Sequence, residues 1–338
     1  MISEKSWVLS KSVLVKILEI LKSSLGYYSE NEVYGNLYIL NEYCGVPIGT
    51  RIIGRLEHSP YLSHINSHRA ISSSNSSTYN NNLSDTYVWL KRDEDSAKHM
   101  GWHNFKAIGA PWLYFLALKK SHGFDYLIPH SDRNIDELWI FANHSVDKFQ
   151  GGITNELREF LIAVRQSKAD TKLVALFYTD YFSLSKQDRE EFSDLKIVTL
   201  LGSRLKSSSA NAHLYTLFHL LSNVKCLTLD FPSTMMLYAM TLNCDIKWFK
   251  NASYEMVKKE AIEIGSYDLV EVLTAKNLTK EFKSEFAEKE LGLDSLKTPQ
   301  ELRTIFGWTE SGMISRVAVA RMLQCLLLAP FRYLNRER

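Results

Sequence analysis

Histidine, hydroxyl, aspartate, glycine and arginine side chains follow four short apolar runs in the middle of the chain. The runs occupy residues 138–141, 173–178, 196–201 and 225–229. Hydroxyl groups and small-residue turns at the start of a helix can bind a phosphate, and an arginine can add a bidentate, charge-assisted contact. The sequence therefore predicts an anion-binding site built from the residues that follow these runs, namely His144, Ser145, Asp180, Gly202, Ser203, Arg204, Ser233 and Thr234.

The elements that carry these side chains follow a repeating pattern. Between residues 137 and 249 the chain repeats one unit three times: a short apolar run, a turn of small residues and a helical pattern. Buried strands that alternate with helices form parallel sheets, and such sheets bind ligands beyond the carboxyl ends of their strands. We therefore expect the candidate residues to meet at one edge of a sheet.

Several candidates also have an ordinary structural interpretation. Ser233 and Thr234 are suitable helix N-caps without any ligand, and Arg204 could form a surface ion pair. Asp180 could bind a ribose hydroxyl or only cap a turn. The strand-end position of His144 favours a functional role.

The first third of the chain shows the same alternation. Residues 86–90 and 105–111 resemble strands, each followed by a helical pattern, whereas residues 34–40 fit either a strand or a partly buried helix. Glu57 and His58 follow an apolar run that starts at Ile52, and such a pair could exchange protons near neutral pH. A lone histidine is, however, more often structural.

Together these patterns predict an α/β protein with two facing Rossmann-like domains and C-terminal helices. We place an N-terminal α/β domain at residues 1–125, a second α/β domain at 126–272 and C-terminal helices at 273–338. A Ser- and Asn-rich stretch at residues 63–84 is expected to form a mobile loop of the first domain. The charged helices predicted at 254–264 and 281–291 are expected to have solvated faces.

The bulk properties exclude several classes of protein. A length of 338 residues with 45% hydrophobic and 23% charged residues is typical of a globular protein, and the net charge of +2 gives no signature of nucleic-acid binding. The four cysteines are too widely spaced to form a metal site, so we expect buried, reduced thiols. The sequence has no P-loop, no Gly-x-Gly-x-x-Gly turn and no Gly-x-Ser-x-Gly elbow. These absences argue against kinase, dehydrogenase, zinc-enzyme and serine-hydrolase functions.

The start of the chain lacks the basic and apolar regions of a signal peptide, and no apolar stretch approaches the roughly 20 residues of a spanning helix. We therefore expect a cytoplasmic protein. The C-terminal residues 331–338 are basic and aromatic and could touch the anionic inner-membrane face.

Six segments between residues 51 and 249 resemble, in the same order, a family of bacterial polysaccharide-biosynthesis proteins that are encoded with capsule and O-antigen genes and are similar to GT-B glycosyltransferases. The segments are residues 54–58 (Gly-Arg-Leu-Glu-His), 107–114 (Ala-Ile-Gly-Ala-Pro-Trp-Leu-Tyr), 138–145 (Leu-Trp-Ile-Phe-Ala-Asn-His-Ser), 176–181 (Leu-Phe-Tyr-Thr-Asp-Tyr), 198–204 (Val-Thr-Leu-Leu-Gly-Ser-Arg) and 229–239 (Leu-Asp-Phe-Pro-Ser-Thr-Met-Met-Leu-Tyr-Ala). The chain departs from the family pattern at Ser59, where glycine is usual, and at Ser203, where histidine is usual. The proline of the family's Pro-x-His-Ser segment is also missing.

The resemblance implies a metal-independent glycosyltransferase without a separate cofactor. Its second domain would hold a nucleotide-sugar donor, with Ser233, Thr234 and Arg204 at the phosphate and His144 at the leaving oxygen. Glu57 or His58 of the acceptor-side first domain would act as general base. The acceptor would be a glycan or lipid-linked glycan of a surface polysaccharide or lipopolysaccharide.

The sequence leaves alternatives open for both the donor nucleotide and the activity. The His-Ser and Ser-Thr pairs also resemble short motifs of bacterial sialyltransferases, which implies a CMP-activated donor as one option, while a UDP-sugar stays open. The departures from the family pattern allow a non-catalytic glycan-assembly or binding protein with a GT-B-like fold. A nucleotide-sugar epimerase is a third alternative.

Overall fold

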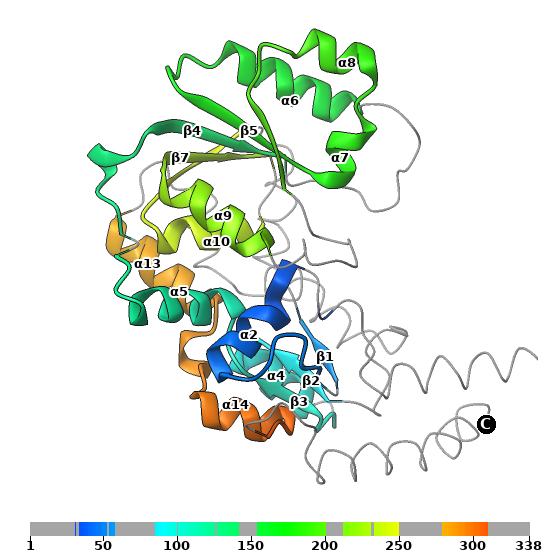
Figure 1. Ribbon diagram of the computed structural model, residues 1–338, viewed down its shortest axis with the longest axis vertical. Helices are drawn as coiled ribbons and strands as arrows, with labels where there is room; N and C mark the ends of the chain where they lie inside the picture. The colour runs from blue at the N-terminus through cyan, green and yellow to red at the C-terminus, as the bar shows by residue number, and fades with distance from the viewer. Residues whose placement is uncertain are drawn as a thin grey trace, which may run out of the picture.

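The computed structural model describes residues 31, 34–52, 54–57, 85–99, 101–125, 127–141, 154–200, 212–230, 233–249 and 279–309, and every structural statement below concerns these residues. They form two parallel sheets with helices packed around them (Figure 1). The predicted α/β class is therefore confirmed. The Ser- and Asn-rich stretch at 63–84, the helix predicted at 254–264 and the basic C-terminus lie outside the described residues.

The first sheet has three short parallel strands in the order β1-β2-β3. They are β1 (Arg55–Leu56), β2 (Thr86–Val88) and β3 (Phe105–Ala107), and the helices around them are α2 (Asn36–Cys44), α4 (Lys91–His99) and α5 (Pro111–Ser121). The ambiguous residues 34–40 thus belong to a helix. Gly45 ends α2 with a left-handed backbone, and Pro111 begins α5 at the position where a missing N–H costs least.

The second sheet has five parallel strands in the order β6-β5-β4-β7-β8. Its strands are β4 (Ile135–Ile140), β5 (Lys172–Phe177), β6 (Ile197–Leu200), β7 (Val224–Leu229) and β8 (Asp245–Trp248). Four of them coincide with the four apolar runs, because parallel strands buried on both faces consist of nearly continuous apolar residues. The sequence did not indicate β8, an edge strand whose Asp245 and Lys247 are exposed.

Helices cover both faces of the second sheet. On one face, Trp139 and Phe141 pack with Phe160 and Val164 of α6 (Asn155–Gln166), close to α8 (Lys186–Glu191). On the other face, the alternate residue Leu138 joins a core with α9 (Ala212–Ser222) and α10 (Thr234–Thr241) (Figure 1). This sheet is therefore doubly wound and Rossmann-like, and the strand order reverses between β4 and β7.

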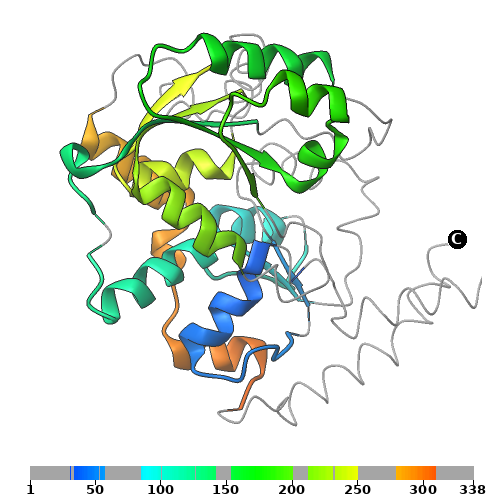
Figure 2. The ribbon, with the colours of Figure 1, turned by 45° about the horizontal axis from the view of Figure 1, so that its top comes forward.

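The two sheets share one apolar core. Helices α2 and α5 beside the first sheet meet α9 and α10 of the second (Figure 2). Trp112 stacks on Tyr238 with ring centroids 4.3 Å apart, and its Nε1 donates to Thr241 Oγ1 at 2.9 Å. The division into facing domains at residues 125 and 272 stays a prediction.

Buried Arg133 fixes the connection from the first sheet to the second. Its guanidinium donates to the carbonyl oxygens of Ile128, Val224 and Leu242 and to the sulfur of Cys244. These acceptors belong to the connection, to β7 and to the turn after α10, so one side chain joins three segments.

Cys44, Cys226 and Cys244 are buried free thiols, as expected, and Cys325 lies outside the described residues.

The chain returns to the first sheet through residues 279–309. This segment contains α13 (Lys280–Glu290), a short 3-10 helix η3 (Leu293–Ser295) and α14 (Pro299–Phe306). Helix α13 packs on α10, and its Lys283 Nζ lies 2.9 Å from Asp245 Oδ1 at the start of β8. At the other end of α13, Glu290 accepts a bidentate pair of bonds from Arg92 beside the first sheet.

The expectation of a solvated α13 is wrong for two of its charged residues. Lys283 and Glu290 are 4% and 5% exposed, respectively. Both are buried because an oppositely charged partner from another element offsets the loss of water. Such partners are distant in sequence and cannot be read from the charge pattern of the helix.

No described helix has the length and apolar character required to cross a membrane.

Gly292 brings the backbone of the returning segment against the first sheet. Its φ is +74°, and a Cβ atom there would lie 2.1 Å from the Trp89 carbonyl oxygen and 3.2 Å from Gly109 Cα. Next to it, the N–H of Ala110 donates to Leu291 O at 2.8 Å. The contact therefore requires a residue without a side chain.

We expect Gly292→Ala to lower the free energy of unfolding by at least about 2 kcal/mol, since it combines backbone strain with a clash against backbone atoms. Urea unfolding measures this change. Gly45→Ala is the matched control, because Gly45 has a similar φ of +64° with no atom within 4 Å of the added Cβ, so only strain of about 1 kcal/mol applies. Equal losses in the two variants would contradict a specific role for the Gly292 contact.

Candidate functional site

The structure describes four of the predicted site residues: Glu57, Asp180, Ser233 and Thr234. The other six lie outside the described residues and stay predictions, namely His58, His144, Ser145, Gly202, Ser203 and Arg204. The four described residues follow strands, as the sequence predicts. Three of them belong to the second sheet and Glu57 belongs to the first.

The carboxyl edge of the second sheet brings Asp180, Asp230 and Ser233 into one region. Strand β5 ends at Phe177, and the short helix α7 (Tyr178–Ser183) that follows it carries Asp180. Asp230 comes directly after β7 and precedes Ser233 at the start of α10. Strands β5 and β7 lie on either side of β4, and the charge of Asp230 contributes to a raised pKa of Asp180. Sequence reasoning did not single out Asp230, although its position directly after a strand run was a usable signal.

Ser233 occupies the N-cap position of α10 but its side chain does not cap the helix. The carbonyl oxygen of Ser233 accepts a bond from the N–H of Met236 at 3.0 Å, while its buried Oγ has no hydrogen-bond partner among the described residues. A buried hydroxyl without a partner is rare in folded proteins. The ordinary N-cap interpretation therefore does not account for Ser233. Thr234, the next residue, is the first residue of α10.

Asp180 is a partly buried carboxyl group with an unpartnered oxygen. Its buried Oδ2 has no hydrogen-bond partner in the described structure. Burial, and then the charge of Asp230, raise the pKa of Asp180 to about 7. Near neutral pH this group can therefore exist both with and without its proton, as groups that transfer protons or bind ligands often do.

Glu57 lies at the carboxyl end of β1 in the first sheet. Its backbone N–H donates to Tyr87 O at 2.9 Å, and its carbonyl oxygen accepts from Trp89 Nε1 at 2.8 Å. The residue is 7% exposed. These backbone bonds fix the main chain at the strand end independently of the carboxyl group, which a substitution can therefore test separately.

Two residues close in sequence, Asn31 and Tyr34, make contacts near the carboxyl ends of the two sheets. Asn31 accepts a bond from Leu56 N at 2.8 Å at the end of β1. Three residues later, the ring of Tyr34 lies 4.9 Å from that of His213 on α9, and His213 stacks on Phe177 at the end of β5 with 6.4 Å between ring centroids. Asn31 thus contacts the end of β1, and Tyr34 contacts α9 beside the end of β5.

Neither His213, which is buried, nor Tyr34 was among the predicted site residues. His213 is 4% exposed, and Tyr34 has a left-handed backbone with φ +62°. A non-glycine residue in this conformation is strained, and such strain is concentrated at functional sites. A histidine within an otherwise apolar helical pattern resembles core in the sequence, which is why it gave no signal.

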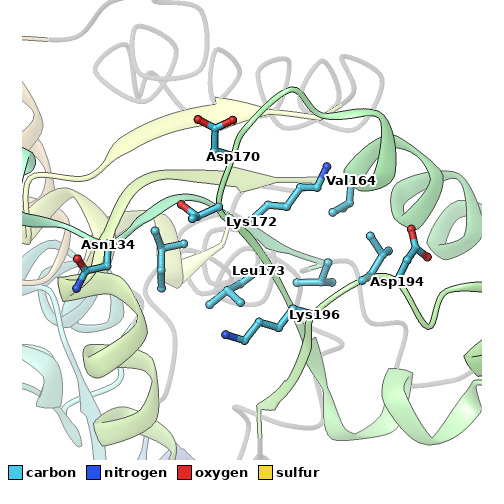
Figure 3. A pocket seen from close by; sticks show the side chains of 11 residues that line it. Asn134, Val164, Asp170, Lys172, Leu173, Asp194 and Lys196 are labelled. Carbon is cyan, nitrogen blue, oxygen red and sulfur yellow. The ribbon is translucent and has the colours of Figure 1, made fainter.

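A cavity of about 490 Å³ lies at the opposite, amino edge of the second sheet (Figure 3). Its lining includes Ile135 at the start of β4, Lys172 at the start of β5 and Lys196 just before β6. Lys172 Nζ donates to Arg165 O and Ser167 O at the end of α6, and Asp194 pairs with Arg165. These charges hold α6 to the sheet. Parallel sheets bind ligands at the other edge, so we do not assign the donor site to this cavity.

The described residues contain no group of three or more His, Cys, Asp or Glu side chains arranged to hold a metal ion.

No model of a protein family matches the sequence. No curated protein matches it either. A search of solved structures finds a likeness to a variant of the wall teichoic acid polymerase TagF, with a TM-score of 0.30 and 14% sequence identity over 75% of this chain and 59% of that chain. The chain thus spans less than two thirds of the TagF structure. A TM-score of 0.30 does not establish a shared fold, so the Rossmann-like assignment rests on strand order and helix packing.

We expect the stability of the protein to depend on pH through Asp180. Its folded-state pKa of about 7 lies above the ordinary value of 3.8, so the stability that its proton provides is complete below pH 3.8 and is lost as the pH rises through 7. Asp180→Asn should therefore raise the free energy of unfolding at pH 8 relative to the natural protein, by on the order of 2 kcal/mol, and much less at pH 4. Urea unfolding at the two pH values measures the difference.

Asp188→Asn is the control of opposite sign. Ser185 and Arg158 lower the pKa of Asp188, so its contribution is present above the ordinary pKa and is lost as the pH falls. This variant should be less stable than the natural protein at pH 8. An Asp180→Asn variant that also loses stability at pH 8 would show that Asp180 is charged and stabilised in the fold.

Proposed function

We propose that the protein is a glycosyltransferase that binds a nucleotide-sugar donor at the carboxyl edge of the second sheet. The observation that carries the proposal is the buried, unpartnered Oγ of Ser233 at the start of α10, beside the point where the strand order reverses between β4 and β7. Ligands of doubly wound sheets bind at such a reversal point. This position supports the proposal that a bound ligand supplies the missing partner of Ser233 Oγ.

Phosphate is the ligand group that this position suits. The first N–H groups of a helix have no intrahelical acceptor, and the helix dipole favours negative charge there. The hydroxyl of Ser233 adds a donor to these N–H groups. In the sequence, His144 and Ser145 closely follow Phe141 at the end of β4, on the other side of the reversal point. We propose that they and Arg204 complete the phosphate contacts.

The acceptor would enter from the first sheet. The contact of Asn31 with Leu56, and those of His213 with Tyr34 and Phe177, support an approach of the two carboxyl edges. Glu57, or the adjacent His58, would then take the proton of the attacking hydroxyl group as general base. The sequence resemblance suggests a surface polysaccharide or lipopolysaccharide as acceptor and a CMP- or UDP-activated sugar as donor.

We expect one nucleotide among CMP, UDP, GDP and dTDP to raise the unfolding temperature selectively. A nucleotide at about 100 times its Kd adds roughly 2.7 kcal/mol of stability. Ser233→Ala should weaken its binding about tenfold, because the lost bond goes to a charged phosphate, while the free protein should lose no stability, because its buried Oγ has no partner among the described residues to lose. Thermal shift and calorimetric titration measure the two effects.

Ser185→Ala is the matched control for this substitution. Ser185 is also a helix N-cap, but its side chain accepts the N–H of Asp188 in a complete capping box on α8. This variant should lose about 1 kcal/mol of stability with nucleotide affinity unchanged. Equal nucleotide affinity in the natural protein and Ser233→Ala would contradict the placement of the donor. No shift with any nucleotide would favour a non-catalytic glycan-binding protein.

We expect Glu57→Gln to reduce the rate of sugar transfer by about 10²–10⁴-fold if Glu57 is the general base, with nucleotide affinity unchanged. The substitution leaves the backbone bonds to Tyr87 and Trp89 in place. Initial rates with a saturating donor, together with calorimetric nucleotide binding, provide the test. A destabilised variant with normal turnover per folded molecule would instead assign Glu57 a structural role.

A further inference from the structure

The first residue of α2, Asn36, has a buried amide oxygen without a hydrogen-bond partner in the described structure. The residue is only 2% exposed. Buried side-chain oxygens nearly always have a partner, because an unsatisfied polar group lowers the stability of the folded state. Asn36 therefore carries a polar group that the packing of the helix does not explain.

The start of α2 also offers hydrogen-bond donors. The first N–H groups of an α-helix have no acceptor within the helix, and the N-cap residue of α2 is Gly35, which has no side chain to accept them. Helical side chains tilt towards the N-terminus of their helix, so the amide of Asn36 is directed towards these N–H groups. Donors and an unpartnered acceptor are thus found together at one helix end.

Two other asparagines show how this part of the fold satisfies a buried amide. Asn41, on the same helix, is fully buried, and its Nδ2 donates to Thr50 O at 3.0 Å while its Oδ1 accepts from Gly49 N at 2.9 Å. The amide of Asn31 is likewise bonded through both of its polar atoms, to backbone groups at β1. The missing bond of Asn36 therefore distinguishes it from the structural asparagines around it.

The segment that leads into α2 contacts elements next to both sheets. Asn31 accepts a bond from the N–H of Leu56 at the end of β1. Tyr34, two residues before Asn36, has its ring 4.9 Å from that of His213 near the start of α9 (Figure 2). The start of α2 therefore belongs to the side of the first sheet from which the proposed function brings the acceptor.

A hydroxyl group matches both halves of this arrangement. The amide oxygen of Asn36 can only accept a hydrogen bond, and backbone N–H groups can only donate one. A hydroxyl group can do both, whereas a carboxylate can only accept and an ammonium group can only donate. We propose that Asn36 and the start of α2 bind a hydroxyl group of the acceptor glycan. This inference rests on the proposed function for the identity of its ligand, and it makes Asn36 a residue that selects the acceptor.

Saturation-transfer NMR of the full chain tests the proposal with methyl glycosides of glucose, galactose, N-acetylglucosamine and N-acetylgalactosamine as probes. At least one glycoside should bind to the natural protein. Asn36→Leu should weaken its binding about tenfold, because a side chain of similar size loses the acceptor oxygen. Nucleotide affinity, measured by calorimetric titration, should stay unchanged. The midpoint of urea unfolding should stay unchanged or rise, because no bond to a described residue is lost.

Asn41→Leu is the matched control on the same helix. It removes the bonds to Thr50 and Gly49, so it should lower the urea midpoint and leave glycoside binding per folded molecule unchanged. The contrast between the two variants separates an amide that holds the fold from one that binds a ligand.

The other outcomes overturn the proposal or the proposed function separately. A lower urea midpoint in Asn36→Leu, or a variant that does not fold, would show that the amide serves the fold. Unchanged glycoside binding in folded Asn36→Leu, or nucleotide binding without binding of any glycoside, would overturn the acceptor contact and leave the donor site standing. Glycoside binding that depends on Asn36 in a protein that binds no nucleotide would support the contact and overturn the proposed donor site.

Discussion

The backbone contact at Gly292 is the constraint on which the relation of the two sheets depends. Gly292 lies against Trp89, directly after β2, and against Gly109, two residues after β3 of the first sheet. Helix α13, immediately before it, packs on α10 beside the second sheet, and its Lys283 pairs with Asp245 of β8. One rigid segment therefore touches both sheets, and the ion pairs of Lys283 and Glu290 fix its two ends. No predicted site residue belongs to this segment.

Much of the second sheet could be predicted from the sequence, because a strand buried on both faces appears as a continuous apolar run. Strand β8 could not, since its exposed, charged residues hide a strand at the sheet edge. Residues 34–40 were ambiguous because a short apolar run fits either type of element. The structure favours a helix there, with left-handed backbone at Tyr34 and Gly35 before it and at Gly45 after it. Such dihedral angles are decided by tertiary contacts.

The candidate site was predictable in position but not in detail. Connectivity alone places Asp180, Ser233 and Thr234 after strands, because every strand of a parallel sheet points the same way. Whether Ser233 caps its helix depends on the geometry of its Oγ, which the residue type does not specify. The effect of the Asp230 charge on the pKa of Asp180 depends on strand order, since β5 and β7 are separated by β4. Strand order is a property of long-range packing.

The two edges of the second sheet differ in how their polar groups are satisfied. At the amino edge, Asp136 pairs with Lys225, Glu137 with Lys247 and Asp194 with Arg165. At the carboxyl edge, Asp180 and Ser233 each have a buried oxygen without a partner in the described structure. Each buried polar group without a hydrogen bond lowers the stability of the folded protein by about 1–3 kcal/mol. A bound ligand can offset this loss by supplying the missing bonds. The amino edge therefore serves stability, and the carboxyl edge is the part of the sheet whose polar groups a ligand would complete.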